Sequence, residues 1–299
     1  MSRRATSVVT AAALVVSALV TGCQSAASGG GSGLRVVAST SVYGGIAAEI
    51  GGDQVSVTSI ISDPSQDPHS YQADARTELT LSRADVVVQN GGGYDEFVHT
   101  MLSASNSKAT VIDAVEVSGR TAPAGGELNE HVWYDIPSVR KVVGRLVTDF
   151  SAKDRAAGTS FRRNATAFTT KLEALRSTEA SIKAAHAGEG IAITEPVPLY
   201  LLSACGLVNR TPAQFSKAVE EGDGVPITVL KHTLDLFRQH TVELLAYNTQ
   251  SSGRETDEVL AAAKSNGVPA VGFTETMPRG QDYVSWMSAN LAAVKAALV

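Results

Sequence analysis

Short apolar stretches alternate with amphipathic stretches along most of the chain. The apolar stretches are rich in Val and Ile and predict buried strands, which cover residues 34–39, 55–61, 84–90, 109–115, 191–194, 242–248 and 269–273. Between them, helical periodicity and capping residues predict helices at 43–50, 75–82, 94–102, 199–205, 227–239, 254–266 and 281–298. Strands that alternate with helices indicate parallel α/β layers, one set in each half of the chain.

The middle of the chain has a different pattern, without a strand signal from about residue 137 to 186. Phe161, Phe168, Leu175 and Ile182 recur every seven residues, which predicts one long amphipathic helix of roughly 40 Å. The apolar stripe is too short for a coiled coil, so we expect it to pack on both domains. Asp135 precedes this region and is expected to cap a helix that starts near residue 137, rather than to bind a ligand. The predicted fold is α/β, with two lobes of mainly parallel sheets joined by one long rigid helix.

The first residues have the pattern of an export signal. Arg3 and Arg4 precede an apolar run over residues 8–20, which is too short for an ordinary spanning helix. The run ends in Val-Thr-Gly-Cys, which resembles the bacterial lipobox, so Cys23 is expected to carry lipid. The alternative is a plain signal peptide with an incidental cysteine. The Gly/Ser-rich segment 24–33 that follows is typical of a flexible tether.

These patterns divide the chain into five parts. We expect a signal peptide (1–22), a lipidated tether (23–33), an N-terminal lobe (34–136), a helical segment with the linking helix (137–187) and a C-terminal lobe (188–299). The sequence therefore predicts an exported protein, anchored by lipid on the extracytoplasmic face of the cell membrane.

Composition narrows the class of partner. The net charge is −5 and no basic cluster lies beyond the first four residues, which argues against nucleic-acid binding. There are two cysteines, so lipid on Cys23 would exclude a disulfide within the chain. Cys205 lies in the apolar run LYLLSACGL and is expected to be a small core residue rather than a nucleophile.

Four polar residues follow predicted strands: His69, His131, Glu195 and Glu275. Ligands of parallel α/β sheets bind outside the carboxyl ends of the strands, so these side chains converge if the two lobes face each other. Two imidazoles and two carboxylates suit a divalent transition metal in the cleft between the lobes. Taken singly, each residue has an ordinary explanation, as a solvated histidine or a turn-capping glutamate. The remaining histidines lie on predicted helix surfaces or ends and are assigned no role: His99, His186, His232 and His240.

Several segments resemble the solute-binding lipoproteins of zinc and manganese ABC importers. DPHSYQ (67–72) is similar to that family's metal-binding DPH-x-Y-(E/Q) segment, and NEHVWYDIPSVRKVV (129–143) to its second metal-binding segment. ADVVVQNGGGYDEFV (84–98), TEPVPLYLLSACGL (194–207) and TETMPRGQDYVSWMSANLAAV (274–294) resemble three further segments. The resemblance covers residues 34–299 and implies that His69, His131, Glu195 and Glu275 hold one metal ion.

The resemblance implies a binding protein and not an enzyme. Such a protein captures Mn²⁺ or Zn²⁺ as a monomer and delivers it to a membrane permease that a cytoplasmic ATPase drives. Glu195 stands where zinc-type members have His, and residues 116–130 lack the His-rich loop of many zinc members, which favours manganese. Zinc nevertheless outranks manganese in intrinsic affinity at most N/O sites. The alternatives are a secreted metal-dependent hydrolase, which needs an open coordination position, and a metal-binding surface adhesin.

Overall fold

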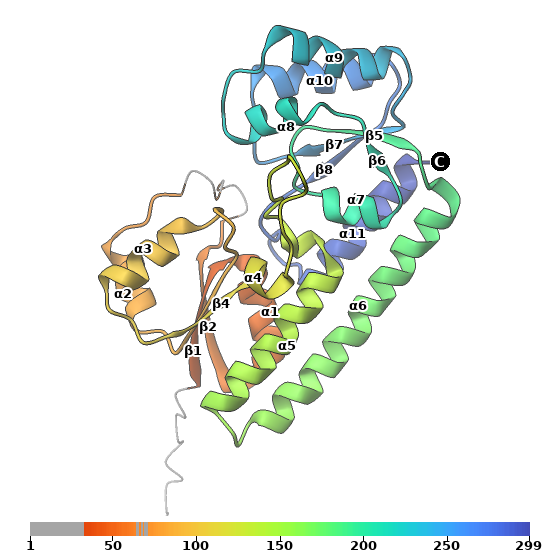
Figure 1. Ribbon diagram of the computed structural model, residues 1–299. Helices are drawn as coiled ribbons and strands as arrows, with labels where there is room; N and C mark the ends of the chain where they lie inside the picture. The colour runs from red at the N-terminus through yellow and green to blue at the C-terminus, as the bar shows by residue number, and fades with distance from the viewer. Residues whose placement is uncertain (1–32, 64–65, 67, 69–70) are drawn as a thin grey trace, which may run out of the picture. The chain divides into compact units, whose positions relative to one another are not determined.

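The structure is a computed structural model that describes residues 33–63, 66, 68 and 71–299 (Figure 1). The predictions for residues 1–32, including Cys23, and for His69 lie outside the described residues. Within the described part of the chain, none of the helices has the length and apolar character needed to cross a membrane.

The N-terminal sheet has four parallel strands in the order β2-β1-β3-β4. They are β1 (Leu34–Thr40), β2 (Val55–Ile61), β3 (Val86–Gln89) and β4 (Thr110–Asp113). Their connections contain α1 (Ser41–Gly51), η1 (Gly52–Gln54), α2 (Ala75–Ser82) and α3 (Glu96–Ala104). Helix α4 (Ala114–Ser118) starts directly after β4. The predicted strand at 109–115 is therefore wrong at its end, because the Asp113 side chain accepts from the Glu116 N–H and starts α4.

The C-terminal sheet repeats this topology, with parallel strands in the order β6-β5-β7-β8. Its strands are β5 (Gly190–Ile193), β6 (Val208–Asn209), β7 (Leu244–Asn248) and β8 (Ala270–Phe273). The helices of this part are α7 (Leu199–Ala204), α8 (Ala213–Glu220), α9 (Ile227–Arg238), α10 (Arg254–Ser265) and α11 (Tyr283–Ala297). The pattern did not predict β6 or α8, because a strand of two residues has no periodicity to detect.

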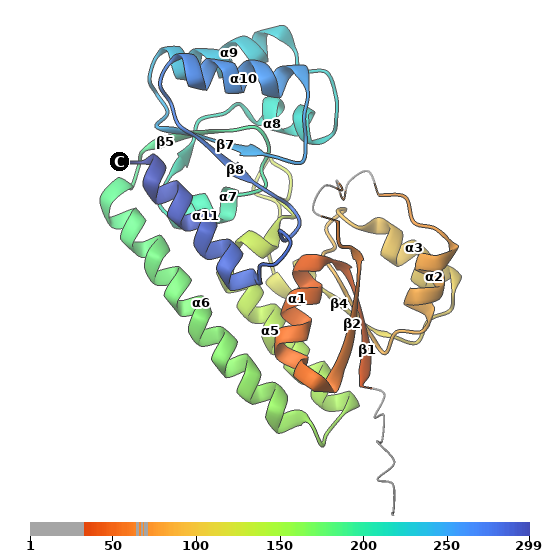
Figure 2. The same cartoon turned by 180° about the vertical axis from the view of Figure 1, so that it is seen from behind.

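Two helices follow the N-terminal sheet in the chain and precede the C-terminal sheet. They are α5 (Ile136–Lys153) and α6 (Gly158–His186), and the 3-10 helix η3 (Val132–Tyr134) comes before them. The Asp135 side chain accepts from the Ser138 N–H, which confirms the predicted cap. With 29 residues, α6 is about 44 Å long. It lies against α1, α5, α7 and α11, as both views show (Figures 1 and 2). The domain limits at 136/137 and 187/188 remain predictions.

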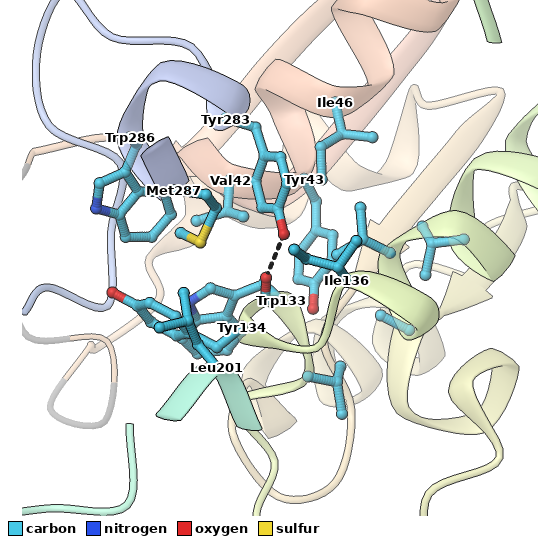
Figure 3. Close-up of a cluster of buried hydrophobic side chains, with 14 of the residues drawn as sticks. Val42, Tyr43, Ile46, Trp133, Tyr134, Ile136, Leu201, Tyr283, Trp286 and Met287 are labelled. Carbon is cyan, nitrogen blue, oxygen red and sulfur yellow. Dashed lines mark hydrogen bonds between the residues drawn. The ribbon is translucent and has the colours of Figure 1, made fainter. Parts of the chain in front are cut away.

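One buried core contains side chains from both sheets and from the helices between them. Trp133 and Tyr134 of η3 lie against Tyr283 and Trp286 of α11, with α1 and α7 alongside (Figure 3). The Tyr283 hydroxyl donates to the Trp133 carbonyl at 2.6 Å, and the rings of Tyr134 and Trp286 are 5.5 Å apart. Each buried aromatic side chain stabilises the fold by about 1.5–3 kcal/mol, so this packing holds η3 and α11 together.

Cys205 is fully buried in this core. Burial, with a smaller contribution from the Glu179 carboxylate, raises the pKa of its thiol to about 12. A thiol with this pKa is a poor nucleophile at neutral pH, which confirms the prediction of a core residue.

Candidate metal centre

The sheet topology defines where a ligand site can form. In each sheet the first strand lies between the second and the third, so the strand order reverses at β1/β3 and at β5/β7. Ligands of such sheets bind beyond the carboxyl ends of the strands at these switch points. Glu195 follows β5 closely and Asn248 is the last residue of β7, so both stand at the second switch point. Glu275 lies just past β8, the next strand.

His131 is fully buried at the start of η3. Its Nδ1 lies 2.8 Å from the Asn129 Oδ1, an atom that only accepts, so Nδ1 carries the proton and donates. The ring nitrogen that presents its lone pair is therefore Nε2. Tyr94 and Trp133 contact the imidazole edge-on, at 5.9 and 5.1 Å between ring centroids. A histidine oriented in this way is typical of a metal ligand.

Asn129 also connects His131 with the segment that carries Glu195. Its Nδ2 donates to the Pro196 carbonyl at 3.0 Å, and its own carbonyl accepts from the Tyr200 hydroxyl at 2.8 Å. The loop before η3 is thereby held against the residues that follow β5. Asn129 therefore links the His131 imidazole to the segment that carries Glu195.

Glu195 and Glu275 form a buried pair of carboxylates, 2% and 1% exposed. The Asn248 Nδ2 donates to the Glu195 Oε2 and to the Glu275 Oε1, both at 2.7 Å. The second oxygen of Glu195 accepts from the Ser251 hydroxyl, and that of Glu275 from the Tyr94 hydroxyl at 3.0 Å. Tyr94 thus contacts both the His131 ring and the Glu275 carboxylate, and Asn248 links Glu275 to Glu195.

Negative charge is concentrated at this place. Burial, followed by the carboxylates of Glu130, Glu195 and Glu275, raises the pKa of Glu220 to about 9. Burial and the Glu275 carboxylate also raise the pKa of Tyr94 well above its ordinary value. Buried carboxylates that repel one another favour the binding of a cation.

Within the residues that the structure describes, one group has the spacing of metal ligands. It consists of Glu130, His131 and Glu220, whose ligand atoms lie within 4.8 Å of one another. Glu195 and Glu275 do not join this compact group. The four-ligand set predicted from the sequence therefore stays a prediction, with His69 outside the described residues.

Sequence reasoning missed several residues of this site. Asn248 could have been found, because it ends a strand next to the one that Glu195 follows. Asn129 lies in the same motif as His131, but its hydrogen bonds depend on tertiary structure. Glu220 had no signal, because α8 itself was not predicted.

The other histidines and Asp135 are where the sequence placed them. His99, His232 and His240 are exposed. His186 contacts Glu189 at 3.1 Å, close to the end of α6. Asp135 pairs with Arg120 at 2.7 Å, in addition to capping α5.

Comparison with solved structures confirms the fold. The periplasmic zinc-binding protein TroA from Treponema pallidum superposes with a TM-score of 0.76 at 18% identity, over 89% of this chain and 99% of that chain. A crystal structure of ZnuA gives a TM-score of 0.74 at 20% identity, over 89% and 98%. The chain therefore has the two-lobed α/β fold of TroA and ZnuA, as predicted.

Comparison of the sequence with known families identifies the family of this chain. Residues 36–297 match the family described as zinc-uptake complex component A, periplasmic, and the chain belongs to this family. The manganese-binding lipoprotein MntA of Bacillus subtilis (strain 168) is 33% identical over 172 residues, 55% of this chain and 56% of that protein. The chain thus matches about half the length of that relative. The metal ABC transporter substrate-binding lipoprotein FimA of Streptococcus parasanguinis is 24% identical over 90% of this chain and 91% of that protein.

Proposed function

We propose that this protein captures one divalent transition-metal ion, Mn²⁺ or Zn²⁺, outside the cytoplasmic membrane and delivers it to an ABC importer. The observations that carry the proposal are the buried His131, whose Nδ1 donates to Asn129, and two buried carboxylates that share the Asn248 amide. Tyr94 contacts both the His131 ring and the Glu275 carboxylate. Family membership and relatives named as metal-binding lipoproteins support it.

The ion is proposed to bind to His131 Nε2, His69, Glu195 and Glu275. Bringing a divalent cation next to Glu195 and Glu275 offsets the repulsion between two buried carboxylates, which supplies part of the binding free energy. A hydrolase would need an open coordination position and a general base beside it, and four protein ligands leave little room for either. A binding protein, consistent with the solute-binding family, is therefore the function that this arrangement supports best.

The choice of metal follows from the donor set. Carboxylates can bind through two oxygens and allow more than four bonds, which suits manganese, whereas zinc favours tetrahedral sites rich in His or Cys. With Glu195 and Glu275 in the site, we propose manganese as the physiological ion. Zinc can still bind more tightly in a test tube, because its intrinsic affinity is higher.

Metal titration tests the proposed function. The purified metal-free protein should take up one Mn²⁺ or Zn²⁺ per chain in calorimetry, and should hydrolyse neither ester nor peptide panels when loaded with metal. The function would be wrong if neither metal bound at micromolar concentration. Metal-dependent turnover on a panel substrate would instead support the hydrolase.

The N-terminal segment is proposed to anchor the protein through lipid on Cys23, so that it works beside its permease and the cytoplasmic ATPase. Relatives named as lipoproteins support this. Mass spectrometry of protein from native membranes should find a chain that begins at Cys23 and carries acyl groups. An N-terminus elsewhere, or an unmodified Cys23 thiol, would contradict the anchor.

A further inference from the structure

Glu220 lies against the nitrogen that the proposed metal site would use. It is the last residue of α8, and its Oε1 is 3.7 Å from the His131 Nε2. Its side chain is only 15% exposed. The Oε1 atom is buried and has no hydrogen-bond partner among the described residues. An ionisable oxygen in such a place calls for a functional explanation.

The distance between the two atoms fits shared coordination better than direct bonding. At 3.7 Å it is too long for a hydrogen bond. Two donor atoms that each lie about 2.0–2.2 Å from one ion are separated by roughly 3–4 Å at ordinary coordination angles. The spacing of His131 Nε2 and Glu220 Oε1 is therefore that of two ligands of one metal ion.

The charges around Glu220 connect it with the predicted carboxylate ligands. Glu195 and Glu275 lie near enough to act on it electrostatically, as does Glu130. In the chain, Glu195 follows β5, Glu275 follows β8, and Glu220 ends α8. A cation there would be attracted by all of them.

We propose that Glu220 is a further ligand of the captured ion, adding a carboxylate oxygen beside His131 and biasing the site towards manganese over zinc. This inference rests on the proposed function. With Glu195 and Glu275, Glu220 makes a third carboxylate, which raises the number of oxygen donors beyond what a tetrahedral zinc site needs. Manganese, which accepts more oxygen ligands, gains more from it.

The test compares Glu220→Gln with Glu221→Gln. Glu221 follows directly in the chain and has a side chain that is 50% exposed, so the second variant makes the same Glu-to-Gln change without removing a ligand. Mn²⁺ and Zn²⁺ affinities of both variants and the wild type are measured by competition in the same metal buffers. A thermal melt of each metal-free protein establishes that it is folded.

We expect E220Q to bind Mn²⁺ at least about tenfold more weakly, with a smaller loss for Zn²⁺, and E221Q to stay close to the wild type. Equal Mn²⁺ affinities of E220Q and E221Q would overturn the proposal. Equal losses of Mn²⁺ and Zn²⁺ affinity would also overturn it, because a change in the electrostatic field alone acts on both ions. A wild type that binds neither metal would instead contradict the proposed function itself.

Glu220→Asp separates coordination from charge. It keeps a carboxyl group that can ionise but withdraws it by one methylene group. We expect E220D to lose most of the Mn²⁺ affinity that E220Q loses. If E220D binds like the wild type while E220Q does not, the charge of Glu220 rather than its coordination is responsible, and the proposal is wrong.

Discussion

Replacing His131 with phenylalanine is expected to weaken Mn²⁺ and Zn²⁺ binding by at least about 100-fold. Phenylalanine keeps an aromatic ring between Tyr94 and Trp133, so the buried packing survives, but it removes both ring nitrogens. The Nε2 lone pair, oriented by the hydrogen bond from Nδ1 to Asn129, is the donor that this change deletes. Calorimetric titration of the metal-free proteins measures the loss.

The matched control for this variant is His99→Phe. His99 is exposed on α3, and this change should leave both affinities within about twofold of the wild type. Melting curves of the metal-free forms show whether either variant is unfolded. Binding by H131F within about threefold of the wild type would remove His131 from the ligand set.

Replacing Asn248 with leucine is expected to lower the free energy of unfolding of the metal-free protein by about 2–4 kcal/mol. The side chain has a similar volume but lacks the amide that donates to Glu195 and Glu275. Both carboxylates are buried, so each loses a hydrogen bond that water does not readily replace. Saturating Mn²⁺ should recover part of this loss, because the cation takes over the stabilisation of the two carboxylates.

A double-mutant cycle with Glu195→Gln tests this explanation. Neutralising Glu195 should reduce the cost of Asn248→Leu, since one buried negative charge then no longer needs a donor. Asn248 Oδ1 also accepts from the Gln250 N–H at 3.0 Å, and that bond is lost in either background. If Asn248→Leu lowers the free energy of unfolding equally with and without Glu195→Gln, and equally with and without metal, the loss comes from the Gln250 contact or from packing.

The fold could be predicted from the sequence to a large extent, for a physical reason. Parallel strands buried on both faces appear as continuous apolar runs, as β3 does with its three buried valines. The edge strand β2 also runs from Val55 to Ile61 as predicted. Caps such as Asp74 and Asp135 work through local hydrogen bonds, so they too can be identified from neighbouring residues. The edge strand β6 and the helix α8 could not, because β6 is too short for a period and α8 packs on residues distant in sequence.

The candidate site could be predicted only in part. Glu195 and Glu275 follow strands, and the sheet topology then brings them to one edge. The groups that orient them are Asn248, Ser251 and Tyr94, and their roles depend on tertiary contacts that no spacing encodes. Glu220 is the clearest case, because its closeness to His131 arises from segments 89 residues apart in the chain, too far for any local pattern to connect.

Anomalous diffraction from crystals of the Mn²⁺-loaded protein, recorded at the manganese edge, tests the central claim most directly. The account predicts one strong peak per chain, about 2.0–2.3 Å from His131 Nε2, with oxygens of Glu195 and Glu275 bound to the same ion. A peak away from these residues, or no ordered ion at full loading, would contradict the account.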